Sequence, residues 1–156
     1  TDTGIECPLA ALEAESDYRA GLDALYAGEY DTALSLLRPL AESGYAQAQN
    51  KLGDMYFNGR AVTQDYREAA RLYQQSAKLG FNIAQVNLAV LYVTGQGVLQ
   101  DYELAHMWAN IAAANGVESA IERRDDISRM MSQSSVEKAQ TMARGCLQTN
   151  YQECGG

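Results

Sequence analysis

The sequence is poor in the residue types that interrupt helices or bind metals. Its 156 residues include two prolines, two phenylalanines, one tryptophan, one histidine and three cysteines. Proline breaks the interior of a helix, so a chain with only Pro8 and Pro39 favours long helical stretches. One histidine and no Cys-x-x-Cys pair argue against a zinc site, and we expect no cofactor. No window approaches the roughly 20 consecutive apolar residues of a membrane-spanning helix, so we expect no membrane span.

Positive charge is also scarce. Twelve basic residues against twenty acidic ones give a net charge of −8. Such a chain has no general electrostatic attraction to phosphate backbones, so we expect no nucleic-acid partner. The length fits a single domain.

What the sequence does contain is an internal repeat of 36 residues. A shift by this distance aligns Ala48 with Ala84, and the register then continues without a gap to Gly80 and Gly116. The further matching pairs are Gln49/Gln85, Leu52/Leu88, Tyr56/Tyr92, Gly59/Gly95, Val62/Val98, Gln64/Gln100, Asp65/Asp101, Tyr66/Tyr102, Ala69/Ala105 and Ala77/Ala113. Repeats of this length are typical of solenoid folds.

Each repeated unit predicts two helices. The apolar residues of its first half recur at helical spacing and end before Gly59 and Gly95, which suit a left-handed helix end. Gly53 and its counterpart Ala89 are small, as close approach of two helices requires. Asp65 and Asp101 are N-cap residues for the second helix, and Glu68 stands at the capping-box spacing from Asp65.

The rest of the chain predicts variants of this unit. We expect an all-α, right-handed solenoid of antiparallel helix pairs with about eight helices. The last two helices are expected at 118–131 and 135–147, with Ser134 or Ser135 as the cap. The predicted divisions are an N-terminal segment 1–14, a plain repeat 15–44, two loop-extended repeats 46–80 and 82–116, a polar terminal helix pair 118–147 and a tail 148–156.

The loop-extended unit resembles the Sel1-like repeat (SLR) family, a branch of the tetratricopeptide-repeat (TPR) superfamily. The motif is Ala-x-Ala-x-x-x-Leu-Gly-x-x-Tyr-x-x-Gly-x-x-Val-x-x-Asp-Tyr-x-x-Ala, which residues 46–80 and 82–116 match closely. The tail of the chain is similar to that of small bacterial SLR proteins. The resemblance implies a non-catalytic scaffold that binds a protein or peptide, as an adaptor, a regulator or an inhibitor. It also implies a monomer or weak dimer exported to the periplasm, with the cytoplasm as the alternative.

The cysteines leave several pairings open. Cys146 and Cys154 could join across the end of the last helix, Cys7 could reach either of them, or all three could be free thiols. Cysteine-rich SLR relatives have a pair spaced eight apart in every repeat, whereas here that spacing occurs once, at Cys146 and Cys154. The alternative function that those relatives suggest is a hydrolase of the cell wall or one that interacts with β-lactams.

In TPR-like stacks the first helix of each pair lines the concave face, which gives a set of candidate partner-binding residues. An apolar groove rimmed by Asp54, Glu122 and Asp126 would favour a hydrophobic segment flanked by Lys or Arg. The alternative interpretation is that the terminal helices bury the valines of this set. The candidates are Tyr18, Leu22, Asn50, Asp54, Phe57, Asn58, Val86, Val90 and Val93.

Residues with catalytic potential are explained better by packing. His106 stands on an expected second helix with no serine or cysteine motif beside it, and Trp108 takes the place of the core residue Leu72. The charged run 122–126 alternates in sign, which is typical of a solvated helix face. We therefore predict that the protein is not an enzyme.

Overall fold

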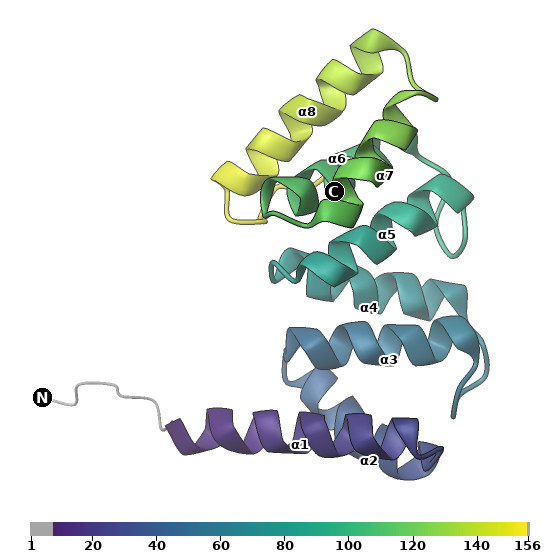
Figure 1. The fold of residues 1–156 in the computed structure, drawn as a ribbon, viewed down its shortest axis with the longest axis vertical. Coiled ribbons are helices and arrows are strands. Elements are labelled where there is room, and N and C mark those ends of the chain that lie inside the picture. Colours follow the sequence, from purple (N-terminus) through teal and green to yellow (C-terminus); the bar gives the residue numbers. More distant parts are fainter. Residues whose placement is uncertain (1–7, 156) are drawn as a thin grey trace, which may run out of the picture.

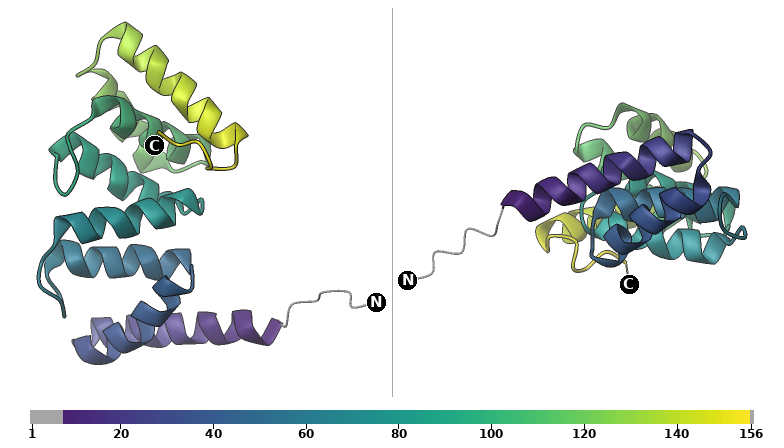
Figure 2. Two further views of the ribbon diagram at one scale, coloured as in Figure 1. Left: turned by 180° about the vertical axis from the view of Figure 1, so that it is seen from behind. Right: turned by 90° about the horizontal axis from the view of Figure 1, so that it is seen from below.

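The protein is a stack of helix pairs. The computed structural model describes residues 8–155, and this range contains eight α-helices and no β-strand, which confirms the predicted all-α solenoid. From α1 to α7, consecutive helices run antiparallel and pack on one another along an elongated molecule, whereas α8 packs on α6 (Figure 1, Figure 2). The helices are α1 (Pro8–Tyr26), α2 (Tyr30–Glu42), α3 (Ala46–Asn58), α4 (Tyr66–Lys78), α5 (Asn82–Thr94), α6 (Tyr102–Ala114), α7 (Glu118–Ser128) and α8 (Gln133–Gln148).

The ends of the central helices follow the predicted signals. Gly59 and Gly95 are left-handed at the ends of α3 and α5, with φ of 66° and 71°. The carboxylate of Asp65 accepts from the N–H groups of Arg67 and Glu68 at the start of α4, and that of Asp101 accepts from the N–H of Leu104 at the start of α6. Only half of the predicted capping box forms. The Glu68 carboxylate pairs with Arg71, and the N–H of Asp65 donates to the carbonyl of Tyr56 instead.

The long loop before α6 packs on the preceding repeat. Gly97, in the loop before α6, has φ of 73°, and a Cβ atom on it would lie 2.0 Å from the carbonyl oxygen of Tyr66. Only glycine therefore allows this loop to rest on the first turn of α4. Its counterpart Ala61 also has a positive φ, of 63°. The left-handed backbone at this position is thus shared by both loops, although the earlier one has alanine there.

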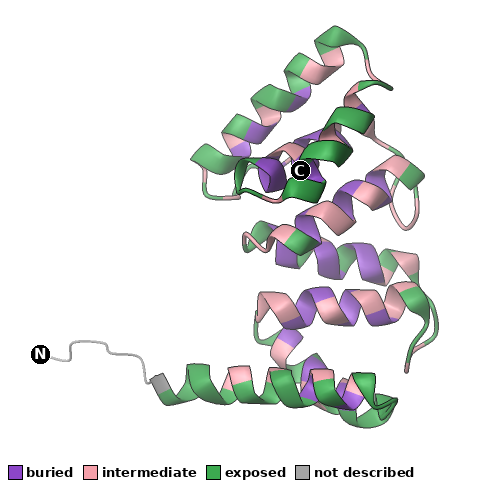
Figure 3. Ribbon diagram, viewed as in Figure 1, coloured by how far each residue is buried: buried purple, intermediate pink, exposed green. Residues whose placement is uncertain are grey.

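The core runs through the stack as rows of small and medium-sized residues (Figure 3). Its largest cluster extends from α4 to α8, and its members Leu88, Met107 and Trp108 are at most 1% exposed. A repeated polar bond crosses from one pair to the next. Gln49 Nε2 donates to the carbonyl of Ala41 at 3.1 Å, and Gln85 Nε2 donates to that of Ala77 at 3.2 Å.

The two ends of the stack differ from the predicted boundaries. Helix α1 begins at Pro8, inside the segment 1–14 that was predicted to precede the first repeat, and its Leu9 and Leu12 are exposed. Helix α7 ends at Ser128, and the cap of α8 is Ser132, whose hydroxyl accepts from the N–H of Ser135. The predicted cap at Ser134 or Ser135 was therefore wrong. Both α7 and α8 pack on α6.

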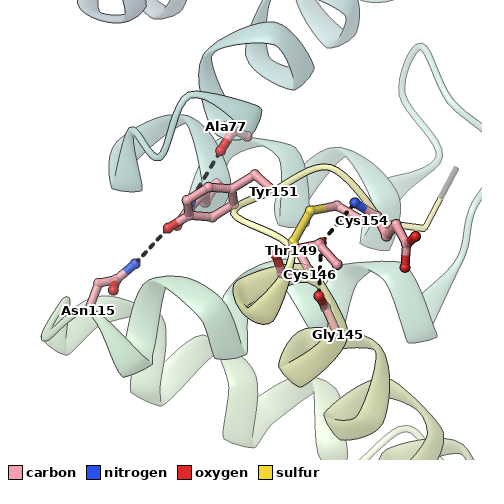
Figure 4. The surroundings of a disulfide bond; sticks show 9 residues. Ala77, Asn115, Gly145, Cys146, Thr149, Tyr151 and Cys154 are labelled. Atoms are coloured by element: carbon pink, nitrogen blue, oxygen red, sulfur yellow. Dashed lines mark hydrogen bonds between the residues drawn. A yellow bond between two sulfur atoms is a disulfide. The ribbon is translucent and has the colours of Figure 1, made fainter.

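The tail folds back onto the last full repeat and is closed by a disulfide. Cys146 and Cys154 are bonded, with their Cα atoms 4.6 Å apart, and both are buried. Cys7 lies outside the described residues. The ring of Tyr151, from this loop, lies against Gly80, and its hydroxyl accepts a hydrogen bond from Asn115 at 3.4 Å (Figure 4).

Candidate partner-binding groove

Four of the predicted groove residues surround one cavity between α3 and α5. Asp54, Phe57, Asn58 and Val90 line a cavity of about 260 Å³. Its other walls are Tyr73, Asn87 and Leu91. The cavity therefore combines a carboxylate, two amides and an apolar wall, and it lies where the sequence placed the middle of the groove.

A second hollow continues the groove toward α1. It measures about 120 Å³ and shares Asp54 and Asn58 with the first cavity. Lys51 and Arg60 contribute two cations to its lining, beside Leu25, Tyr26 and Met55. The two hollows together form a continuous surface over α1, α3 and α5, and we call this surface the inner groove.

The remaining predicted residues lie nearby but mostly serve packing. Asn50 is 4% exposed, and its Oδ1 accepts from Asn87 Nδ2 at 3.0 Å across the α3–α5 boundary. Val86 packs against a small cluster of alanines on α6 and α7, and Val93 packs against the main core. Tyr18 contacts Tyr45, with ring centroids 5.5 Å apart, and Leu22 is half-buried. Of the α5 valines in the predicted set, Val90 alone lines the cavity.

The centre of the groove depends on a residue that the sequence analysis did not include. Tyr73 belongs to α4, yet its hydroxyl donates to Asp54 Oδ1 at 2.7 Å. Gly53 makes this reach feasible, because a Cβ on Gly53 would lie 2.7 Å from the Tyr73 ring. Burial, assisted by the neighbouring Asp54, raises the pKa of Tyr73, so its hydroxyl remains protonated and a donor.

The next repeat shows that this arrangement is specific to α3 and α4. At the equivalent positions, 36 residues later, Ala89 replaces Gly53, Ala109 replaces Tyr73 and Val90 replaces Asp54. A tyrosine facing a glycine in one repeat thus corresponds to two alanines in the other. The repeat alignment contained this signal, because the glycine and the tyrosine change together between the two units.

The charge of the groove differs from the predicted acidic rim. Glu122 and Asp126 do not line either hollow, and Asp126 pairs with Arg129 on α7. Asp54 is joined by Lys51, whose Nζ lies 3.2 Å from Oδ2. With Arg60 nearby, the α1 side of Asp54 is cationic, whereas the α5 side is neutral and largely apolar. The predicted preference for segments flanked by Lys or Arg is therefore not supported by the lining.

His106 lies inside the fold. It is 1% exposed, and its Nε2 lies 2.9 Å from the hydroxyl of Ser128. Burial, together with the cationic Arg124, lowers the pKa of His106, while Asp125 acts in the opposite direction. Trp108 is likewise buried. Within residues 8–155 no group of three His, Cys, Asp or Glu side chains has the geometry of a metal site. No helix in that range is long and apolar enough to cross a membrane.

Comparison with known proteins identifies related sequences and folds. Residues 46–81 and 82–117 match the family model of the Sel1 repeat. A Sel1 repeat protein from Oxalobacter formigenes is 35% identical with a TM-score of 0.67, over 72% of this chain and 88% of that one. A protective antigen of uropathogenic Escherichia coli strains, which displays an SLR fold, has a TM-score of 0.84 at 25% identity over 90% of this chain. The chain spans 31% of the length of that antigen. No curated protein sequence matches significantly.

The contact between Gly53 and Tyr73 predicts a coupled pair of substitutions. Gly53→Ala alone should reduce the free energy of unfolding by about 1–3 kcal/mol, because the added methyl group overlaps the tyrosine ring. In a Tyr73→Ala background, the same change should be neutral or stabilising by up to about 1 kcal/mol, because alanine favours helix over glycine. Urea denaturation of all four variants measures the coupling, and additive effects would contradict the proposed contact.

The buried histidine predicts a pH dependence of stability. Its pKa is lowered in the folded protein, so the unfolded chain binds a proton first as the pH falls below about 6.5. Stability should therefore decrease from pH 7 toward pH 5.5, by at most about 1.4 kcal/mol per pH unit. His106→Gln removes this titrating group and should flatten the profile in denaturation experiments. An unchanged slope in this variant would assign the pH dependence to other groups.

Proposed function

The chain belongs to the Sel1 repeat family, and we propose that it is a non-catalytic scaffold that binds a segment of a partner protein in the inner groove. Proteins with this repeat fold generally mediate protein–protein interactions. The observation that carries the proposal is the cavity between α3 and α5, which combines apolar walls with polar groups that can bind a main chain.

The lining indicates how an extended segment would bind. An apolar side chain of the partner enters between Phe57, Val90 and Leu91. Asn87 uses its Nδ2 for Asn50, which leaves its Oδ1 to accept from a main-chain N–H. Extended segments present such N–H and C=O groups along their length, and side-chain pockets then select the sequence.

The cationic side of the groove adds a preference. Lys51 and Arg60 line the hollow nearer α1, and Asp54 compensates only one of these charges. An acidic side chain of the partner, placed on the α1 side of its apolar anchor, would neutralise the remaining positive charge. This sequence preference replaces the basic flanks expected from the sequence alone.

Binding is supported over the hydrolase alternative. A hydrolase of that kind needs a nucleophile, a base and an oxyanion site that converge in an accessible pocket. His106 is the only histidine of the chain, and it faces Ser128 in the interior rather than either hollow of the groove.

We also propose that the protein is an exported adaptor, regulator or inhibitor. The Cys146–Cys154 disulfide supports this proposal, because such bonds persist mainly in oxidising compartments. Mass spectrometry of the chain, isolated from its native cells with free thiols blocked, should find both cysteines unmodified by the blocking reagent. Blocked Cys146 and Cys154 would argue for a reducing compartment.

The groove is tested by selecting linear peptides that bind the protein and measuring their affinity for variants. Val90→Asp places a charge in the apolar wall and Phe57→Ala removes its aromatic part, so each should weaken binding at least about tenfold. Leu99→Asp is the matched control, since Leu99 is apolar, 90% exposed and outside both hollows. If every selected peptide bound Val90→Asp and Leu99→Asp equally well, the inner groove would be ruled out as a binding surface.

A further inference from the structure

A larger cavity lies on the other side of α3. It measures about 380 Å³ and is bounded by α2, α3 and α4. Its α3 residues are Gln49, Leu52 and Tyr56, whereas Asp54, Phe57 and Asn58 line the inner groove. Since successive helical residues turn by about 100°, Leu52 and Asp54 point to opposite sides of α3. This outer cavity is therefore separate from the inner groove. The rest of its lining is Arg38, Ala41, Glu42, Glu68, Arg71, Leu72 and Gln75.

The outer cavity contains a buried acceptor without a partner. Gln49 is 5% exposed and lines the cavity, and its Nε2 donates to Ala41. Among the described residues, nothing donates to its Oε1. A buried acceptor left unsatisfied costs about 1–3 kcal/mol, so this position favours a ligand that brings an N–H or O–H group.

The repeat supplies a precedent for what fills such a cavity. A shift of 36 residues places its equivalent between α4 and α6, where Leu104 and Met107 replace Glu68 and Arg71. The chain's own tail lies there. Gly155 lies so close to Leu104 that a Cβ on it would be 2.4 Å from Leu104 Cδ2, and its next contacts include Met107.

Tyr151, near the start of the tail, also contacts a residue that has an equivalent 36 positions earlier. The Tyr151 ring lies against Gly80, just after α4, where a Cβ on the glycine would be 3.3 Å from Tyr151 Cε2. The equivalent of Gly80 is Gly44, and nothing lies within 4 Å of the position that its Cβ would take. The place of the aromatic ring is thus occupied in the later repeat and open in the earlier one.

The linings differ in a way that suits different occupants. The tail covers an apolar surface, and it uses its own N–H groups internally, from Tyr151 to Cys146 and from Glu153 to Thr149. It accordingly leaves the Oε1 of Gln85 without a donor. The outer cavity has charged walls instead, with the Glu68–Arg71 pair and Arg38, which suit a polar segment with free N–H groups.

We propose that the outer cavity binds a non-helical segment of a partner polypeptide, at the place equivalent to that of the chain's own tail. An aromatic side chain of this segment lies against Gly44, as Tyr151 lies against Gly80. A main-chain N–H donates to Gln49 Oε1, and polar side chains face Glu68 and Arg71. The site requires no contact with the inner groove, so the two surfaces can be tested separately.

The test uses a display library of linear twelve-residue peptides, selected on the oxidised protein. Gln75→Trp fills the mouth of the outer cavity, and Lys78→Trp places the same side chain elsewhere on the exposed face of α4. We expect a class of aromatic-containing peptides whose affinity falls at least about tenfold in Gln75→Trp and stays unchanged in both Lys78→Trp and Val90→Asp.

Nuclear magnetic resonance then identifies the groove that is occupied. Binding of such a peptide should shift the side-chain amide signals of Gln49 and leave those of Gln85 unchanged. Three results would each overturn the proposal: no Gln75→Trp-sensitive peptide, equal loss in Lys78→Trp, or an unshifted Gln49. The last would mean that the outer cavity holds only water. None of these results bears on the inner groove, which Val90→Asp tests.

Discussion

Burial of apolar rows between consecutive helix pairs is the interaction on which the rest of the structure depends. A single pair cannot cover its own apolar face, so each must pack on the next, and stability comes from these shared boundaries. The largest cluster extends from α4 to α8, and the bonds of Gln49 and Gln85 cross the same kind of boundary. This periodic packing fixes which sides of α3 remain open. The inner groove and the outer cavity are both consequences of it.

Within that constraint, a few residues give one repeat a chemistry that its neighbour lacks. Where the later repeat has two alanines, the earlier one has Gly53 and Tyr73, and the tyrosine hydroxyl holds Asp54 in the groove. On the other side of α3, charged residues replace the apolar ones that the tail covers in the later repeat. Functional differences therefore arise at equivalent positions of one shared scaffold.

The sequence predicted most reliably what the 36-residue period repeats. The bounds of α3 to α6, their aspartate caps and their left-handed glycines follow directly from aligned residues. The period also placed Asp54, Phe57, Asn58 and Val90 on one side, where they line a common cavity. It failed where the chain stops repeating. Contacts that no other unit duplicates determine the start of α1, the Ser132 cap and the path of the tail. The sequence analysis also missed the positive charge beside Asp54, because Lys51 and Arg60 were not among the predicted groove residues.

The two ends of the stack are held very differently. The last repeat is covered by α7, α8 and a tail closed by a disulfide, while α1 carries Leu9 and Leu12 more than 60% exposed. In a quasi-one-dimensional stack each helix is stabilised by its neighbours, and within residues 8–155 α6 packs on α5, α7 and α8, whereas α1 packs mainly on α2. The inner groove therefore joins a part held between several helices, at α3 and α5, to a part held mainly from one side, at α1.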